Sequence, residues 1–202
     1  MKVIGLTGKA AAGKNIVSDV FSRLGCAVID VDQLGRPVLE QNQALLGKTF
    51  GPGVLKEGKV DRKALGTLVF SDPEKLQALE AITHPAMIEE CKRLIDKAEK
   101  EGKEALLINA ALLYRMGLYR LCDHIVLVKA PLLSRFLRSK KRENTTLKKF
   151  MARERAQQDI RADVFPASLP VYILRNGSDK ALIHRQVTAY CATIGIGVSS
   201  AR

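Results

Sequence analysis

A short apolar stretch near the start of the chain runs directly into a loop of small residues. Residues 3–7 read Val-Ile-Gly-Leu-Thr, and residues 8–13 read Gly-Lys-Ala-Ala-Ala-Gly. The next residues, 14–24, carry apolar side chains at helical spacing, namely Val17, Val20, Phe21 and Leu24. Gly25 suits the position after a helix, and 26–30 form a second apolar run. We therefore expect a strand, a loop, a helix and a parallel strand, with a right-handed crossover.

The loop at residues 8–13, called the phosphate loop below, resembles the pattern G-x-x-x-x-G-K-[ST] of nucleotide-binding proteins. Its small residues let backbone N–H groups approach phosphate oxygens, the following helix adds its positive end, and the Lys14 ammonium can reach the β- and γ-phosphates. A plain strand-to-helix turn with a chance lysine is the alternative, but the position between a strand and an amphipathic helix favours phosphate binding. Asn15 stands where a Ser or Thr hydroxyl is expected to bind Mg²⁺.

Asp32 follows the second predicted strand, at the sheet edge where open parallel sheets bind ligands. A carboxylate there can take the proton of an acceptor hydroxyl during phosphoryl transfer. It can equally cap the next helix. The spacing alone leaves both readings open.

Residues 33–101 read as helical and irregular, without a strand, and therefore as an inserted helical lobe. Asp61 and Asp72 suit N-cap positions, Pro73 a first helical position, and the longest helix is predicted over 85–101. A short helix and turn are predicted over 110–121. The remaining predicted strands are 105–109, 124–128 and 171–174. The remaining predicted helices are 131–142, 146–159 and 178–193, with a frayed tail at 195–202.

Positive charge is concentrated in residues 129–161. The chain has 33 Lys and Arg against 21 Asp and Glu, a formal net charge of +12. Residues 129–161 account for eleven of these cations against three acids. Such a segment can be a solvated helical face, a nucleic-acid site, or a lid whose arginines close over a triphosphate. Phe136 and Phe150 are its only aromatic residues and offer little base stacking, and its place between two strands favours the lid.

The remaining composition excludes several classes of protein. The four cysteines are far apart with no C-x-x-C pair, and we expect buried, reduced thiols. The three histidines are scattered, so no zinc site is expected. We find neither a signal peptide pattern nor an apolar run of the roughly 20 residues that a membrane helix needs, which favours the cytoplasm.

Several motifs follow one another along the chain. The N-terminal ones are Ile4-Gly5-Leu6-Thr7-Gly8, Gly13-Lys14, and Val28-Ile29-Asp30-Val31-Asp32 with Arg36. Those in the middle of the chain are Phe50-Gly51, Val60-Asp61-Arg62, Thr83-His84-Pro85, Leu112-Leu113 before Gly117-Leu118, and Cys122-Asp123. The basic segment adds Arg138, Arg142, Arg153 and Gln157. Together, these motifs and their spacing resemble those of the dephospho-coenzyme A kinase family, from Val3 to about Asp159 and again weakly at Asn176.

The resemblance implies an α/β, three-layer P-loop kinase fold like that of nucleoside monophosphate kinases, with a parallel five-stranded sheet. It implies a nucleotide-binding core of residues 1–32, 102–130 and 162–202, a helical substrate lobe of 33–101 and a basic lid of 131–161. The implied reaction is ATP-dependent phosphorylation of the ribose 3′-hydroxyl of dephospho-coenzyme A with Mg²⁺, without nucleic acid or membrane as partner. The oligomeric state is not implied.

The resemblance also implies roles for single residues. Asp32 would be the base, while Lys14 and Arg138 would stabilise the transferred charge. The implied ATP-binding residues are Gly8, Ala10, Ala11, Ala12, Gly13, Lys14, Asn15, Ile16, Arg142 and Asn176. The implied acceptor-binding residues are Thr7, Asp32, Arg36, Arg62 and His84. Asn15 would meet the metal through Mg-ATP.

The sequence departs from the family pattern around the expected metal. Asn15 replaces the loop hydroxyl, Asn109 a common acid at a strand end, Arg115 a common Glu, and Lys129 a common Asp. Each change of an acid removes negative charge from a magnesium environment. Two other functions therefore stay open: a degenerate nucleotide-binding protein with little catalysis, and a kinase for another nucleoside or nucleotide. The net charge also leaves a nucleic-acid-binding module as a third.

Overall fold

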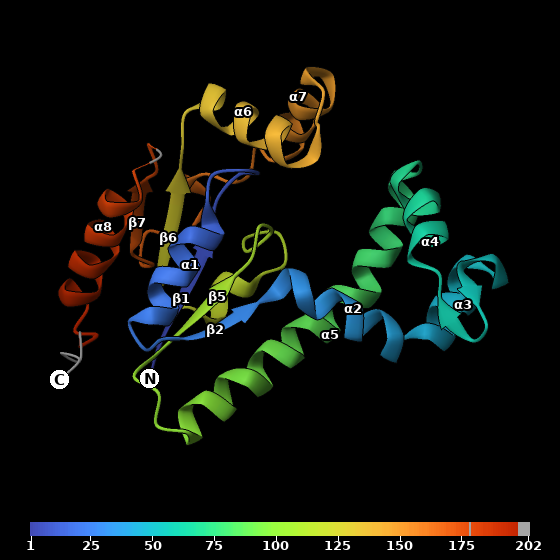
Figure 1. Cartoon of the computed structure of the whole chain (residues 1–202). Helices are drawn as coiled ribbons and strands as arrows, with labels where there is room; N and C mark the ends of the chain where they lie inside the picture. The colour runs from blue at the N-terminus through green and yellow to red at the C-terminus, as the bar shows by residue number, and fades with distance from the viewer. Residues whose placement is uncertain (178, 198–202) are drawn as a thin grey trace. The chain divides into compact units, whose positions relative to one another are not determined.

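The computed structural model describes residues 1–177 and 179–197 (Figure 1). The chain divides into two compact units. The first comprises Met1–Asp30 and Leu94–Arg202, and the second comprises Val31–Arg93. Among the described residues, no helix is both long and apolar enough to span a membrane.

A five-stranded parallel sheet forms the centre of the first unit, in the order β2-β5-β1-β6-β7. Its strands are β1 (Lys2–Thr7), β2 (Ala27–Asp30), β5 (Ala105–Asn109), β6 (His124–Lys129) and β7 (Val171–Arg175). Residues 3–7 of the central β1 are all buried, which explains their unbroken apolar character. The predicted parallel sheet and fold class are confirmed. Because all strands run the same way, their carboxyl ends share one edge.

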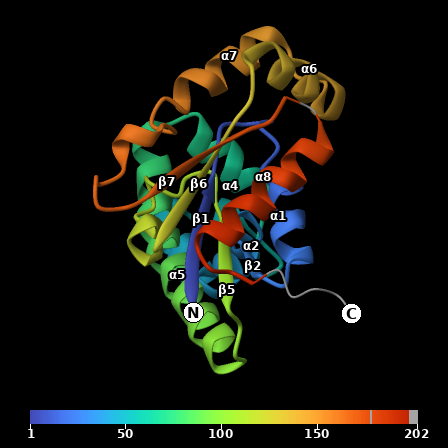
Figure 2. The same cartoon turned by 90° about the vertical axis from the view of Figure 1, so that its left-hand side faces the viewer.

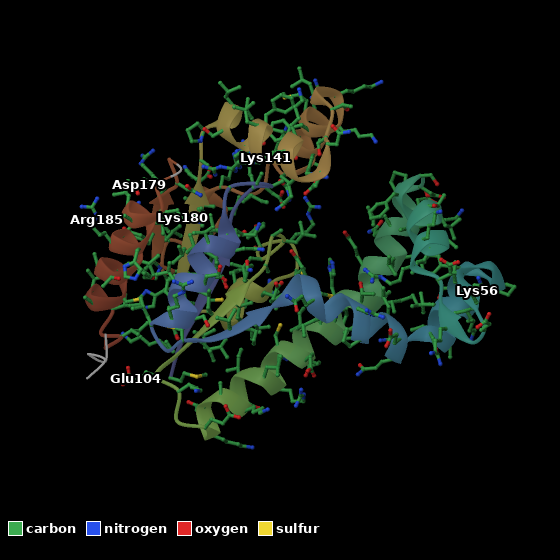
Figure 3. All side chains as sticks on the ribbon, viewed as in Figure 1. Lys56, Glu104, Lys141, Asp179, Lys180 and Arg185 are labelled. Atoms are coloured by element: carbon green, nitrogen blue, oxygen red, sulfur yellow. The ribbon has the colours of Figure 1, made fainter. Side chains whose placement is uncertain are left out.

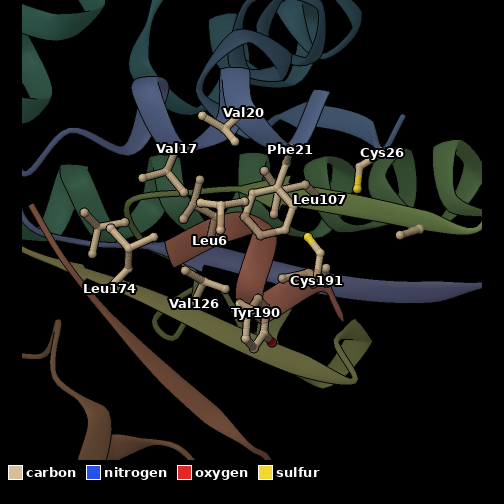
Figure 4. Packing of buried hydrophobic residues seen from close by; sticks show 14 of the residues in the cluster. Leu6, Val17, Val20, Phe21, Cys26, Leu107, Val126, Leu174, Tyr190 and Cys191 are labelled. Carbon is tan, nitrogen blue, oxygen red and sulfur yellow. The ribbon is translucent and has the colours of Figure 1, made fainter. Parts of the chain in front are cut away.

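Helices α1 (Lys14–Arg23) and α8 (Lys180–Thr193) pack together over one face of this sheet (Figure 2). Phe21 of α1, Leu6 of β1 and Cys191 of α8 meet in the buried cluster between them (Figure 4). The predicted frayed tail is wrong for Ile196, which is buried in the same cluster and whose N–H donates to the Cys191 carbonyl at 2.9 Å. Residues 198–202 and Ser178, the predicted start of α8, lie outside the described residues.

Gly5 of β1 brings the segment after β5 close to the sheet. A Cβ at this position would lie 2.6 Å from Leu113 Cδ2, 2.8 Å from Ile125 Cδ1 and 2.9 Å from Cys122 Sγ. The helix predicted over 110–121 is reduced to a 3-10 helix at Leu118–Leu121. The segment before it is turned, and Gly117 has a φ of 73°, which interrupts helical geometry.

We expect Gly5→Ala to lower stability by about 1–3 kcal/mol, because the added methyl overpacks a full core. Thermal unfolding followed by circular dichroism measures the loss. Gly66→Ala is the matched control, since its Cβ would meet Phe70 at an ordinary 3.6 Å. If both variants unfolded at the temperature of the unmodified protein, the packing at Gly5 would not be as described.

Two helices connect β6 to β7. Helix α6 spans Leu132–Glu143 and α7 spans Leu147–Ala156, close to the predicted helices, followed by a 3-10 helix at Ala162–Val164. Asn144 ends α6 in the left-handed conformation, and the Thr146 hydroxyl accepts the Lys149 N–H to begin α7. Basic side chains crowd this α6–α7 pair, Lys141 among them (Figure 3).

The second unit is mostly helical, but the prediction that it holds no strand is wrong. Strands β3 (Leu55–Lys56) and β4 (Lys59–Val60) form an antiparallel hairpin of two residues each. Such strands are too short to show a period in sequence, and their turn at Glu57 and Gly58 has positive φ at both residues. The helices of this unit are α2 (Val31–Gln41), α3 (Gln43–Phe50), α4 (Arg62–Phe70) and α5 (Pro73–Lys100), with a 3-10 helix at Pro52–Val54.

The longest helix, α5, begins at Pro73 rather than at Pro85 and continues into the first unit. The predicted N-caps are confirmed: Asp61 Oδ1 accepts the Lys63 and Ala64 N–H groups, and Asp72 Oδ1 accepts the Glu74 N–H at 3.0 Å. Pro85 lacks an N–H, yet it does not end the helix. The packing of earlier α5 residues, Leu76 and Leu79, in a buried cluster of this unit favours helix on both sides of it.

Candidate active site

The phosphate loop lies between β1 and α1, at the carboxyl edge of the sheet. Gly13 occupies the N-cap position of α1 with a φ of 100°, and a Cβ there would lie 2.1 Å from Asn176 Nδ2. At Gly8, a Cβ would lie 2.6 Å from the Val128 carbonyl oxygen. Both positions thus leave no room for a side chain, which explains the two glycines of the motif.

The start of α1 is arranged to attract an anion. The first N–H groups of a helix have no partner within it, and α1 has no acidic residue in its first turn. The Lys14 ammonium donates to the Gly8 carbonyl at 3.0 Å, so the side chain folds over the loop. Together these groups offer hydrogen-bond donors and positive charge to a phosphate.

Two residues distant in sequence contact the same loop. Arg138 of α6 donates to the Ala11 carbonyl at 3.3 Å and to Asn176 Oδ1 at 3.3 Å. Asn176, just after β7, is 1% exposed and donates to the Ala12 carbonyl at 2.8 Å. The structure therefore brings both of these predicted site residues to the phosphate loop.

Helix α7 and its C-cap residue, Gln157, add contacts that the sequence did not single out as a site. Gln157 Oε1 accepts the Ala10 N–H at 2.8 Å. Glu154 forms ion pairs with Lys9 of the loop and with the buried Arg135 of α6. Gln157 could have been found from the family spacing that it keeps. No sequence period links Lys9 to Glu154, because they are 145 positions apart.

Two other arginines named in the sequence analysis have partners away from the loop. Arg142 of α6 pairs with Glu143, which Arg153 also contacts at 2.9 Å. The hydrogen bonds from Arg153 and Arg142 lower the pKa of the Glu143 carboxyl. Arg115 forms two hydrogen bonds with Asp159, at 3.2 and 3.0 Å, just beyond α7.

Four predicted acceptor residues lie in the second unit. Asp32 and Arg36 are exposed on α2, Arg62 is the first residue of α4, and His84 lies in α5 directly before Pro85. Asp32 is the second residue of α2, so it does not occupy the N-cap position. Arg36 forms an exposed ion pair with Glu40 at 3.4 Å.

Two further predicted site residues lie in the first unit. Thr7, the last residue of β1, is buried and donates its hydroxyl to the Ala111 carbonyl at 3.1 Å. Ile16 of α1 is 36% exposed beside the loop. The Thr7 hydroxyl therefore fixes the segment after β5 to the end of β1.

The residues around the sheet edge fit a magnesium ion. Asn109 Oδ1 is buried and has no hydrogen-bond partner within the described residues, and Asn109 pairs in register with Asp30. Asn15 is exposed in the first turn of α1. Mg²⁺ prefers oxygen ligands, and several of its ligands in proteins are usually water molecules and phosphate oxygens. The described residues contain no group of three or more His, Cys, Asp or Glu that could hold a metal, so phosphates and water would supply most ligands.

Burial makes three of the four cysteines poor nucleophiles. Cys26, Cys91 and Cys191 are buried as predicted, whereas Cys122 is only partly buried. Burial raises the pKa of the Cys26 and Cys91 thiols to about 11 and that of Cys191 to about 12. These three thiols therefore stay protonated at neutral pH and are suited to packing.

Comparison with known proteins agrees with this geometry. Residues 2–179 match the profile of a family described as dephospho-CoA kinase. A dephospho-CoA kinase of Bartonella quintana is 34% identical over 200 residues, covering 93% of this chain and 95% of the relative. One of Symbiobacterium thermophilum is 41% identical over 136 residues, covering 63% of this chain and 55% of the relative. The solved structure of a dephospho-CoA kinase from Campylobacter jejuni is 26% identical, with a TM-score of 0.72 over 96% of this chain and 98% of that one.

Proposed function

Because the chain belongs to the dephospho-CoA kinase family, we propose that it transfers a phosphoryl group from ATP to the ribose 3′-hydroxyl of dephospho-coenzyme A, giving coenzyme A and ADP. The observation that carries the proposal is the family match over residues 2–179, which includes the phosphate loop, the whole second unit and the first unit up to the start of α8. A panel of nucleosides and nucleotides offered with ATP tests it. Faster turnover with any of them than with dephospho-coenzyme A would favour a kinase for another acceptor.

The donor half of the reaction belongs to the phosphate loop. Its N–H groups and the Lys14 ammonium would hold the β- and γ-phosphates, and the Arg138 guanidinium, already at the loop, would neutralise charge on the transferred group. Mg²⁺, when bound with ATP, supplies further charge neutralisation at the phosphates. Asn15 and Asn109 offer amide oxygens to that ion.

The acceptor half belongs to the second unit. The Asp32 carboxylate would take the proton of the 3′-hydroxyl as that oxygen attacks the γ-phosphorus. Arg36 and Arg62 are exposed cations of this unit and are suited to bind the phosphates of dephospho-coenzyme A. His84 would also bind the acceptor. Residues 33–101 would form the substrate lobe. Residues 131–161 would close as a lid over the nucleotide, and the Arg142 side chain would then leave Glu143 and bind the nucleotide.

We expect Asn15→Ser to raise turnover, because a hydroxyl is shorter than an amide and suits direct contact with Mg²⁺. ADP formation at saturating ATP and varied Mg²⁺ measures the change. Asn15→Ala, which has no side-chain oxygen, is the control and should lower turnover. An unchanged or lower rate in Asn15→Ser would show that Asn15 is an adapted ligand or that the metal is held elsewhere.

The neutral amide of Asn109 at the sheet edge favours one other function, that of a nucleotide-binding protein with little catalysis. Tight ATP binding, with no ADP formed from ATP in the presence of any acceptor, would establish it. We also propose a cytoplasmic location and neither nucleic acid nor membrane as partner.

A further inference from the structure

Both helices of the α6–α7 pair hold the phosphate loop. From α6, Arg138 donates to the Ala11 carbonyl. From α7, Glu154 pairs with Lys9. Gln157, the C-cap residue of α7, accepts the Ala10 N–H. Glu154 lies in the last turn of α7, three positions before Gln157. The loop and the helix pair are thus joined at several consecutive loop residues.

Glu154 is the centre of these contacts. One carboxylate oxygen pairs with Lys9 Nζ and the other accepts from Arg135 Nη1 at 2.6 Å. Arg135 is 5% exposed, donates through Nε to the Ala130 carbonyl at 3.2 Å, and packs its guanidinium on the Phe150 ring. Burial raises the pKa of the Glu154 carboxyl, but the hydrogen bonds from Arg135 and Lys9 outweigh it and leave the pKa below its usual value. Glu154 is therefore ionised at neutral pH.

We propose that Glu154 is a positioning residue that fixes the phosphate loop to α7 and thereby sets the affinity for ATP. Its carboxylate binds both Lys9 of the loop and Arg135 of α6. Because these contacts hold the end of α7 against the loop, Gln157 stays within hydrogen-bonding distance of the Ala10 N–H. A loop held in one conformation loses less conformational entropy on binding than a loop that must first be ordered. The inference rests on the proposed function only in requiring that the loop bind ATP.

Simple charge effects make the opposite prediction for Glu154. A carboxylate near the triphosphate repels it, so its removal alone would strengthen ATP binding, whereas removal of the Lys9 ammonium would weaken it. Positioning predicts that both removals weaken binding. It also predicts that they are not additive, because each breaks the same Lys9–Glu154 contact.

A double-mutant cycle on the full chain tests this. ATP binding is measured by calorimetry, without acceptor, for Lys9→Met, Glu154→Gln and the double variant. We expect each single variant to bind ATP about tenfold more weakly, and the double variant to lose about tenfold rather than about a hundredfold. Tighter binding by Glu154→Gln, or losses that multiply, would overturn the proposal.

Two controls separate positioning from loss of charge and from misfolding. Lys103→Met removes an exposed cation just before β5, outside the proposed lid, and should leave ATP affinity unchanged. Lys9→Arg keeps the charge and the contact and should restore the affinity that Lys9→Met loses. If Glu154→Gln fails to fold because Arg135 is left unpaired, Glu154→Asp replaces it, because it keeps the charge but its shorter side chain cannot span Lys9 and Arg135. Positioning predicts weaker ATP binding by Glu154→Asp, and unchanged affinity in this variant would overturn the proposal.

A failure of the positioning role can be told apart from a failure of the proposed function. If the proposed function is wrong, the protein binds ATP but does not phosphorylate dephospho-coenzyme A. The double-mutant cycle measures ATP binding alone and needs no acceptor. A wild-type protein that bound no ATP would overturn both.

Discussion

Replacing Asp32 with asparagine is expected to lower turnover about 100- to 10,000-fold while leaving ATP affinity nearly unchanged. The amide keeps the size of the side chain but cannot take the proton of the acceptor hydroxyl. Because transfer is otherwise a matter of positioning and charge neutralisation on the donor side, ATP binding at the phosphate loop does not depend on that proton. ADP formation with dephospho-coenzyme A measures turnover, and calorimetry measures ATP affinity.

Asp96→Asn is the matched control, since it removes one exposed carboxylate from α5 at a position with no proposed role. It should turn over at the rate of the unmodified protein. Wild-type turnover in Asp32→Asn would remove Asp32 from the mechanism. Loss of ATP binding together with turnover would assign it to nucleotide binding instead.

Gly13→Ala is expected to weaken ATP binding by about 10- to 100-fold, which corresponds to the roughly 1–3 kcal/mol of strain at such a position. The new methyl would meet Asn176 Nδ2 at 2.1 Å, in a backbone conformation with a φ of 100°. Asn176 would have to leave the Ala12 carbonyl and would disturb Arg138, which it also contacts. Calorimetric titration with ATP measures the loss.

Gly25→Ala is the control that separates backbone strain from close approach. Gly25 also has a positive φ, 88°, but a Cβ there would meet nothing within 4 Å. We expect it to lose some stability and to keep its ATP affinity. Equal ATP affinity in Gly13→Ala and the unmodified protein would show that Asn176 can move from the loop without consequence.

The features that could be predicted from sequence are those that depend on residues close together in the chain. The apolar run of β1, the glycines of the phosphate loop and the apolar face of α1 each carry a local signal. The N-caps at Asp61 and Asp72 do so as well. The hairpin of β3 and β4 is too short for a period, and Pro85 is a local signal that tertiary packing overrode.

The candidate site also combines residues that could be predicted from sequence with contacts that could not. Arg138 and Asn176 were expected at the nucleotide from the family resemblance, and the structure brings both to the loop. The contacts of Lys9 with Glu154, and of Arg115 with Asp159, join residues 145 and 44 positions apart. Such pairs depend on how helices pack after folding, and charge alone does not indicate which acid a given lysine or arginine will meet.

The most direct test of the central claim is product analysis after incubation with ATP, Mg²⁺ and dephospho-coenzyme A. We predict one ADP for each coenzyme A formed, with the new phosphate on the ribose 3′-oxygen and no product when Mg²⁺ is chelated. ADP without coenzyme A, or a phosphate on another oxygen, would contradict the account.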